Sequence, residues 1–392
     1  MNEEKFILNA ARLDLSDENV TVLTAMSDKV DPDLLFRKAF FHGVTPLIYY
    51  SLKKHNLTQL LSADLFDKFK EHYHQTVLTN LKFIKKTNEL SKILEEKIVL
   101  LKGAHLIHNF YPDIGIRSMS DIDVLVEIER ADAVFNTLKS NGFVRQGPNR
   151  QSIITSTAKS TVHNKVVPFH HLDILSSDHC DIEIHTNLFE YHDFYYLTKE
   201  ALKKAVLIKP DRNLYRLSNE FFLIHLCNHF FLHNYLHKQK GKNLRMLCDI
   251  NEFILQRDAD IDWDEINDMC SESEQQDRVS TVLTYANHFL QTPVPENFIQ
   301  KDIINENLIS IDCLANYNSP AIKKQRDNLN RFFFRLGKFD NPFEVFVFVF
   351  RTLFPASEWI NNNFNTRNNT KGWLTGYFRY WSDLFTRYVL KL

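Results

Sequence analysis

The chain has 392 residues, 47 Lys and Arg against 49 Asp and Glu, a net charge near −2 and a hydrophobic content of 44%. This length accommodates two or three domains, or one domain with large helical additions. The near-neutral balance excludes a strong overall electrostatic field for nucleic acid and offers no general attraction to an anionic membrane.

Cysteine usage and the N-terminus indicate the compartment. The five cysteines contain no CxxC pair, which is typical of reduced thiols in a cytoplasmic protein. The N-terminal MNEEKFILNAARLDL lacks a basic lead and a long apolar run, so we expect no signal peptide. The longest apolar stretch, 343–354, carries Glu344 and Arg351 and is too short to span a bilayer, so we expect no membrane partner.

Residues 1–97 are predicted to be helical. Apolar residues recur at helical spacing from Leu65 to Leu94, and breaks are expected at 27–32 and 56–58. We see no chemistry in this region and expect it to pack against the rest of the protein.

The stretch from 98 to 126 carries the first candidate site. An apolar run, Ile98 to Leu101, ends in Lys102-Gly103, and a short helical pattern follows to Phe110. A glycine between a strand and a helix allows backbone N–H groups to bind an anion at the helix N-terminus. A tight strand-to-helix turn explains Gly103 equally well.

The sequence SDIDVLV then predicts a strand with two carboxylates on one face, Asp121 and Asp123. Such a pair suits Mg²⁺, which is commonly held by one or two carboxylates and substrate phosphates. A triphosphate could lie between the helix start and this metal, with Arg117 and Ser120 in reach of it. The alternative is a polar strand end with solvated carboxylates and solvated loop residues.

Beyond this strand, residues 131–141 have the pattern of an amphipathic helix that Gly142 closes. Two strands are expected, at 166–175 and 180–185, around a turn at 176–179. In the second strand polar and apolar residues alternate, so Asp181, Glu183 and His185 share a face. An edge strand with a polar outer face would show the same alternation.

Residues 191–392 are predicted to return to helix. His225, His229, His233 and His237 recur every four residues and therefore follow one helix face. Pairs of this spacing can bind zinc, but the absence of HExxH and of an obvious third ligand disfavours a zinc site.

The combination of LKG with RSMSDIDVLV resembles nucleotidyltransferases of the DNA polymerase β-like superfamily, and more narrowly the bacterial uncharacterised nucleotidyltransferase family. The resemblance implies that Gly103 forms the family's glycine turn and that Asp121 and Asp123 bind metal. Many members have Gly-Ser or Gly-Gly at the turn. This chain has Gly103-Ala104, so a hydroxyl contact to phosphate is missing, and Lys102 is the candidate to replace it.

The resemblance also implies a third carboxylate on a neighbouring strand, which completes one metal site and helps to deprotonate the attacking hydroxyl. IEIHTNL is similar to the family's acid-x-His strand, so Glu183 is the first choice, Asp181 the second and Asp173 the third. His185 would order this acid or contact substrate, or make a structural hydrogen bond.

A second pair of motifs extends the resemblance, with His225 and His229-Phe230 on one helix and Gly241, Arg245 and Cys248-Asp249-Ile250 on the next. His225 and His229 are then candidates for supporting the site or contacting substrate. Arg245 could bind phosphate, and Asp249 could hold Arg245 or His225 in place. Buried structural pairing is the alternative. Members often carry Lys where this chain has Asn228.

The sequence therefore predicts an α+β fold in which a small mixed nucleotidyltransferase sheet with helices, residues 98–190, is enclosed by helical regions at 1–97 and 191–392. The implied activity moves a nucleoside monophosphate from an NTP to a hydroxyl-type acceptor with two Mg²⁺ or Mn²⁺ ions held by Asp121, Asp123 and Glu183. An NTP-binding module without turnover is the alternative. The acceptor stays open among small molecules, RNA and protein, as does the base of the NTP.

Overall fold

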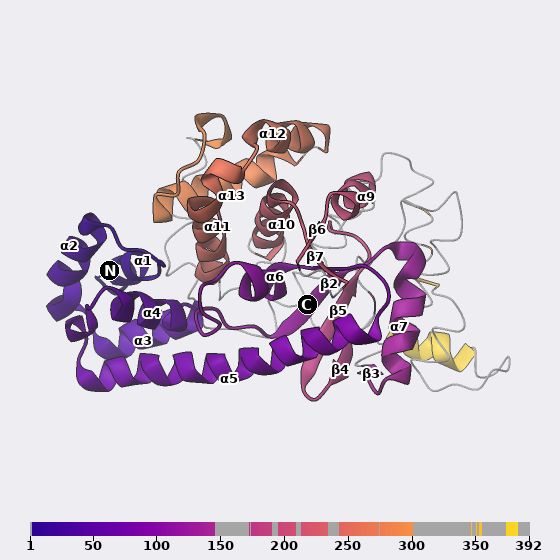
Figure 1. Ribbon diagram of the computed structural model, residues 1–392, viewed down its shortest axis with the longest axis horizontal. Helices are drawn as coiled ribbons and strands as arrows, with labels where there is room; N and C mark the ends of the chain where they lie inside the picture. Colours follow the sequence, from indigo (N-terminus) through magenta and orange to yellow (C-terminus); the bar gives the residue numbers. More distant parts are fainter. Residues whose placement is uncertain are drawn as a thin grey trace. The chain divides into compact units, whose positions relative to one another are not determined.

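The computed structural model describes residues 2–145, 172, 174–189, 195–208, 213–233, 243–273, 275–300, 346, 350, 353–354 and 374–382 (Figure 1). The chain forms two compact units. The first contains residues 1–123, 203–235 and 239–316, and the second contains 124–202, 236–238 and 317–392. The three-part division expected from the sequence stays a prediction.

The N-terminal region is helical, as predicted. Its elements are α1 Asn2–Ala10, α2 Asp17–Met26, η1 Ser27–Lys29, α3 Pro32–Phe41, α4 Thr45–Lys54, η2 Thr58–Leu60 and α5 Ala63–Ile93. The breaks coincide with N-cap side chains: Ser16 caps α2, Asp31 precedes Pro32 at the start of α3, and Ser62 caps α5. Each cap accepts a hydrogen bond from an N–H group that the helix itself cannot satisfy.

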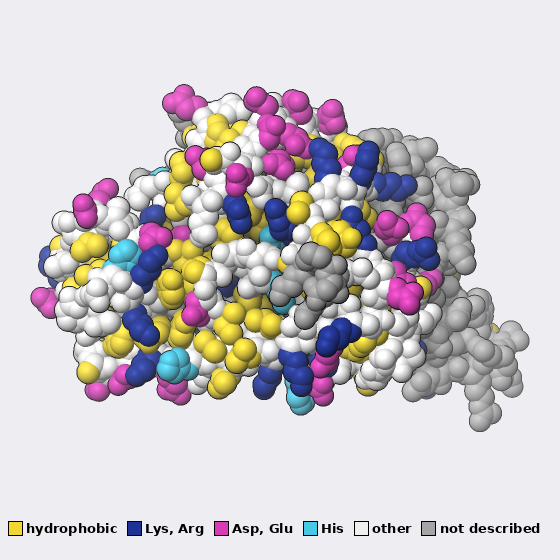
Figure 2. All heavy atoms as spheres, in the orientation of Figure 1, with side chains coloured by type: hydrophobic (Ala, Val, Ile, Leu, Met, Phe, Trp, Pro, Cys, Tyr) yellow, Lys and Arg dark blue, Asp and Glu magenta, His cyan; other side chains and the backbone are white. Residues whose placement is uncertain are grey.

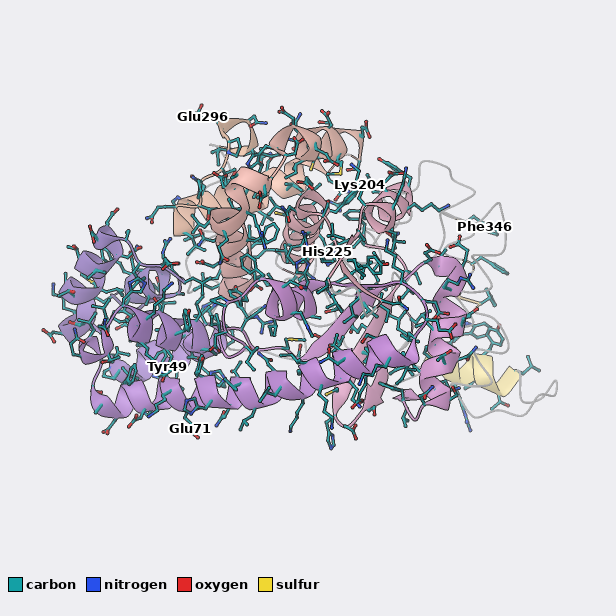
Figure 3. All side chains as sticks on the ribbon, viewed as in Figure 1. Tyr49, Glu71, Lys204, His225, Glu296 and Phe346 are labelled. Atoms are coloured by element: carbon teal, nitrogen blue, oxygen red, sulfur yellow. The ribbon has the colours of Figure 1, made fainter. Side chains whose placement is uncertain are left out.

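The long helix α5 packs its apolar stripe against α3 and α4. Tyr49 of α4 lies against two rings of α5, with centroid distances of 5.2 Å to Phe66 and 4.8 Å to Tyr73 (Figure 3). Farther along α5, several buried polar residues, Asn80 and Thr87 among them, lie between the apolar ones. Buried polar side chains need hydrogen-bond partners, and those of Asn80 lie outside the helix.

A mixed sheet forms the centre of the fold. Its strands are β1 Ile98–Leu100, β2 Asp121–Leu125, β3 Val144–Arg145, β4 Leu175–Ser177, β5 Cys180–His185, β6 Val206–Leu207 and β7 Leu214–Arg216. Among the described residues the strand order is β3-β4-β5-β2-β1-β7-β6. In the first unit β1 runs parallel to β7, and β7 is antiparallel to β6. In the second unit β3, β4 and β5 are antiparallel neighbours. The predicted α+β fold with a mixed sheet is confirmed.

The β4–β5 hairpin is tighter than the sequence suggested. Asp178 and His179 alone form its turn, with φ of 54° and 62°, and Ser177 pairs with Cys180. Two central residues with positive φ are typical of a type I′ turn, whose twist matches that of the flanking strands. The hairpin fixes the alternation along β5, in which Ile182 is buried and Glu183 is partly exposed.

The expectation of helix throughout 191–392 was wrong for β6 and β7, because strands of two and three residues are too short to show alternation. The remaining helices are α6 Lys102–Asn109, η3 Ile128–Arg130, α7 Ala131–Ser140, α9 Tyr195–Lys203, α10 Asn219–Phe231, α11 Asn243–Arg257, η6 Asp258–Asp260, α12 Trp263–Glu272, α13 Gln276–Leu290 and η7 Glu296–Phe298.

Helix α10 is the centre of the C-terminal helical packing. It contacts α11, α12 and α13, and its residues from Glu220 to Asn228 are all buried. A helix surrounded on all sides in this way carries apolar residues around its whole circumference. Among the described residues, none of the helices combines the length and the apolar character that a bilayer-spanning segment needs. On the face drawn in Figure 2, Lys and Arg side chains are interspersed with acidic and apolar ones.

One buried carboxyl links α11 to the end of α1. Glu252 is 2% exposed and accepts hydrogen bonds from the Asn251 amide, at 3.0 Å, and from the backbone of Leu13. Burial raises its pKa to about 7, against the opposing effects of these hydrogen bonds and of Arg12.

This carboxyl should make stability depend on pH. Between pH 4.5, the ordinary pKa of a glutamate, and about pH 7 the unfolded chain loses the Glu252 proton while the folded chain keeps it, so the unfolding free energy falls as pH rises. A pKa difference of about 2.5 corresponds to a loss of about 3 kcal/mol. We predict that Glu252→Gln, which keeps the shape, removes this decline and is more stable than wild type at pH 8 but not at pH 5. Urea denaturation across this range measures the effect.

Asp268→Asn, at an exposed carboxylate of α12, controls for the loss of one negative charge. Parallel pH profiles for wild type and Glu252→Gln would contradict the prediction.

Candidate active site

The connection from β1 to α6 places the start of a helix next to β2. Leu101 N–H donates to the Asp123 carbonyl at 3.0 Å, which joins the end of β1 to β2. The next residue, Lys102, has a φ of +42° and begins α6 without a side-chain cap. The first-turn N–H groups of α6 therefore have no capping side chain and can bind an anion.

Gly103 is needed because another side chain lies against it. A Cβ at this position would lie 2.2 Å from Arg117 Nη1 and 3.2 Å from Met119 Cγ. At this strand-to-helix turn the residue with left-handed backbone is Lys102 and not Gly103. Gly103 thus lets the Arg117 guanidinium reach the first turn of α6.

Arg117 is held by a buried acidic partner on α11. Its Nε donates to both carboxylate oxygens of Asp249, at 3.1 and 2.9 Å, and the Tyr111 hydroxyl donates to Asp249 Oδ1 at 2.8 Å. Burial alone would lower the pKa of Arg117, but the Asp249 carboxylate outweighs it and raises the pKa. Asp249 thus accepts hydrogen bonds from Arg117 and Tyr111. Its charge also opposes the lowering of the Arg245 pKa, and the expectation that it holds Arg245 or His225 in place stays a prediction.

Arg245, one turn before Asp249 on α11, contacts the same loop. Its Nη1 donates to both the carbonyl and the hydroxyl of Ser118, each at 3.0 Å. Gly43, with a φ of +69°, leaves room for the Arg245 side chain, whose Cδ would lie 3.4 Å from a Cβ there. Burial and the neighbouring Arg117 lower the pKa of Arg245 to about 10. Within the described part of the chain, Arg245 Nε has no hydrogen-bond partner.

The two predicted aspartates differ in their surroundings. Asp123 is 3% exposed and lies 2.6 Å from Lys102 Nζ. Asp121 is partly exposed and accepts a hydrogen bond from the Ser120 hydroxyl at 3.1 Å. The alternative of two solvated carboxylates therefore fails for Asp123, whose charge is buried with a cation.

The histidine face of α10 lies partly near this ion pair. Burial lowers the pKa of His229 well below 6.5, and Lys102, His233 and His225 add to the effect while Asp123 opposes it. The rings of His225 and His229 stack at 6.4 Å, and Figure 3 shows His225 on α10. No metal-binding group found in the described ranges includes these histidines, whereas His237 and Gly241 lie outside those ranges.

Strand β5 supplies the second pair of predicted side chains. Glu183 Oε2 lies 3.6 Å from Nε2 of His185, which is buried. Asp181, the second choice for the third acid, lies opposite Ser176 in the β4–β5 hairpin. The third choice, Asp173, lies outside the described residues.

A search of the described residues gives one group that could hold a metal ion, formed by Asp123, Glu183 and His185 with their ligand atoms within 4.8 Å of one another. Two carboxylates and an imidazole nitrogen are a donor set that fits a divalent cation. Asp121 is not part of this group, although it shares a strand with Asp123.

Sequence reasoning missed three residues that hold the predicted ones in place. The Tyr111 hydroxyl donates to Asp249, the partner of Arg117, and Gly43 leaves room for the Arg245 side chain. Asn80 of α5 donates to the backbone carbonyl of Arg117. For Gly43 the sequence offers only a glycine between two helical patterns, which indicates a helix end and not a contact with Arg245. The partners of Tyr111 and Asn80 lie 138 and 37 residues away, beyond any local pattern.

Comparison with known protein families gives a match over most of the chain. Residues 28–291 match the profile of a family described as uncharacterised nucleotidyltransferase, which covers more than half of the chain. No curated protein and no solved structure matches the chain.

The Lys102–Asp123 pair generates a stability prediction. Removing one partner of a buried ion pair leaves the other charge uncompensated and typically costs about 3–5 kcal/mol. We predict that Lys102→Met lowers the metal-free unfolding free energy by this amount, and that Mn²⁺ restores most of it by neutralising Asp123. Urea denaturation with EDTA and with Mn²⁺ measures both effects.

Lys204→Met is the matched control, because Lys204 and Glu265 form a more exposed ion pair. It should cost less than about 1 kcal/mol, with no response to Mn²⁺. Equal losses in the two variants, or no recovery of Lys102→Met with metal, would show that Lys102 does not act as the counter-ion of a metal site.

Proposed function

The chain belongs to the uncharacterised nucleotidyltransferase family, and from this premise we propose that it transfers a nucleoside monophosphate from an NTP to a hydroxyl-type acceptor. The observation that carries the proposal is the group of Asp123, Glu183 and His185, which has the donors of a divalent-metal site. Asp123 also pairs with Lys102 at the open N-terminus of α6, which supplies donors for phosphate oxygens.

The triphosphate would bind at the start of α6. The first-turn N–H groups and the Lys102 ammonium lie there, and Arg117 reaches the same turn through the space above Gly103. Arg245 adds a second guanidinium, which donates to Ser118, the residue that follows Arg117. These cations are fixed before the nucleotide arrives, so little side-chain freedom is lost on binding. Ser120 adds a hydroxyl beside Asp121.

Asp121, Asp123 and Glu183 would hold the metal ions. Bound Mg²⁺ or Mn²⁺ would neutralise phosphate charge and lower the pKa of the attacking hydroxyl. Lys102 must release Asp123 for this purpose, and the phosphates then offer its ammonium a new anionic partner. The residue thus exchanges one anion for another without leaving the site.

Glu183 would accept the proton of the attacking hydroxyl. It is the partly exposed member of the group, so an acceptor can reach it, whereas His185 beside it is buried. His185 would fix the orientation of the Glu183 carboxylate. His229, whose pKa is lowered by burial, and His225, whose ring stacks with it at 6.4 Å, would support the nucleotide side of the site.

A nucleotide-binding module without turnover is the second candidate, and Asn228 favours it. The Asn228 amide donates to Gln275 and to the Ile224 carbonyl, so it serves helix packing and supplies no cation at the phosphates. Ala104 likewise supplies no hydroxyl. A module would bind MgATP and release no pyrophosphate.

The acceptor is left open by the site. Incubating the protein with labelled NTPs, Mg²⁺ and fractionated cell extract would show which fraction takes up label. The buried free thiols of Cys180, Cys227, Cys248 and Cys270 fit a reducing compartment such as the cytoplasm.

The metal site predicts metal-dependent nucleotide binding. The double variant Asp121→Asn/Asp123→Asn keeps the side-chain shapes and removes the charges that hold the ions. Calorimetric titration with ATP and GTP, with and without Mg²⁺, should show Mg²⁺-enhanced binding in wild type and none in the double variant. Affinity that is equal in the two proteins would remove the metal-site hypothesis.

The third carboxylate should affect turnover more than binding. The aspartates and the triphosphate can hold one ion without Glu183, whereas the attacking hydroxyl needs a base. Glu183→Gln should lower pyrophosphate release about 10²–10⁴-fold with little change in ATP affinity. Asp181→Asn on the same strand is the matched control and should cost much less. The reverse ranking would assign the base to Asp181.

A further inference from the structure

The long helix α5 contacts the loop between α6 and β2 through one face. Tyr73, Val77 and Asn80 are spaced by four and three residues, so they lie in a row along the helix. The loop they contact, residues 111–120, leads directly into Asp121. Helix α5 therefore lies beside the segment that contains Arg117 and leads into Asp121.

The approach of α5 to this loop is close. A Cβ at Gly115 would lie 2.5 Å from Tyr73 Cζ and 2.6 Å from Val77 Cγ2, so only glycine fits there. The Tyr73 hydroxyl donates to Asp113 Oδ1 at 2.6 Å, and the same oxygen accepts the Gly115 N–H at 2.7 Å. The start of the loop is thus bound to α5 by packing and by a shared carboxylate.

Asn80 binds the second half of the loop. Its Nδ2 donates to the carbonyls of Ile114, at 2.5 Å, and Arg117, at 2.7 Å, while its Oδ1 accepts from Met119 N–H at 3.3 Å. Asn80 is fully buried. A carboxamide has two donor hydrogens and an acceptor on one short side chain, which neither Asp nor Leu reproduces.

The same loop is held from its other side by α11. The Arg117 side chain binds Asp249, and Arg245 binds Ser118. Asn80 fixes the backbone of Arg117, and Asp249 fixes its guanidinium. The two contacts together place that guanidinium against Gly103 at the start of α6.

We propose that Asn80 is a positioning residue for nucleotide binding, which sets the place of Arg117 and the entry of the chain into Asp121. The inference rests on the proposed function. It assigns a role in that function to the N-terminal helical region, through a side chain that lies outside the metal-binding and phosphate-binding groups.

The test compares Asn80→Ala with Thr87→Val. Thr87 lies two turns farther along α5 and is equally buried. Among the described residues its hydroxyl bonds only the Phe83 carbonyl of its own helix, so its loss weakens α5 without removing a bond to the loop. Calorimetry with MgATP should show binding about tenfold weaker in Asn80→Ala, because a displaced Arg117 guanidinium would lose about one charge-assisted hydrogen bond to the nucleotide. Thr87→Val should bind as wild type does.

Hydrogen exchange gives a readout that is independent of nucleotide. Peptides covering 111–121 should exchange faster in Asn80→Ala, with those of α11 unchanged, because Met119 N–H loses its acceptor. The melting temperature of each variant is measured as well, to show that both are folded at the temperature of the assays. If Asn80→Ala does not fold, Asn80→Ser carries the same two measurements.

The outcomes separate the two proposals. Wild-type protein that binds no MgATP overturns the proposed function and this inference with it. Wild type that binds MgATP, with Asn80→Ala binding equally tightly, overturns the inference alone. Equal weakening in Asn80→Ala and Thr87→Val also overturns it, because general loosening of α5 would then explain the effect.

Discussion

The buried ion pair between Lys102 and Asp123 is the interaction on which the candidate site depends. A carboxylate that is almost fully removed from water needs a cation, and Lys102 supplies it from the first residue of α6 at 2.6 Å. The left-handed backbone of Lys102 and the hydrogen bond from Leu101 to Asp123 bring the two elements together. One ion pair therefore joins the uncapped first turn of α6 to the strand that carries both predicted aspartates.

Around this pair the helical regions hold one loop in place. Residues 111–120 are bound by Tyr73 and Asn80 from α5 and by Arg245 and Asp249 from α11. Both helices lie within the residues that match the family, which extend far beyond the strand with the two aspartates. We infer that the helical regions are part of the functional unit, because they fix the guanidinium and the backbone that a nucleotide would meet.

Local patterns predicted much of this arrangement. Three elements are predicted by short-range signals: the strand with Asp121 and Asp123, the alternating strand β5, and the helix α5 with its apolar residues at helical spacing. Each appears where it was expected. The two strands β6 and β7 were not predicted, because they are too short to show an alternation of apolar and polar residues. The partner of Asp249 and the role of Asn80 depend on contacts between distant segments, which spacing does not encode. Gly103 was singled out for its place between a strand and a helix, whereas the structure explains the glycine by the close packing of the Arg117 side chain, which no spacing in the sequence predicts.

The central claim is that this chain transfers the nucleoside monophosphate part of an NTP. The most direct test supplies ATP labelled in either the α- or the γ-phosphate, with Mg²⁺ and fractionated cell extract as the source of acceptor. The account predicts that α-label enters the acceptor and γ-label leaves as pyrophosphate, in wild type but not in Asp121→Asn/Asp123→Asn. Transfer of γ-label to the acceptor, or its release as inorganic phosphate, would contradict the account.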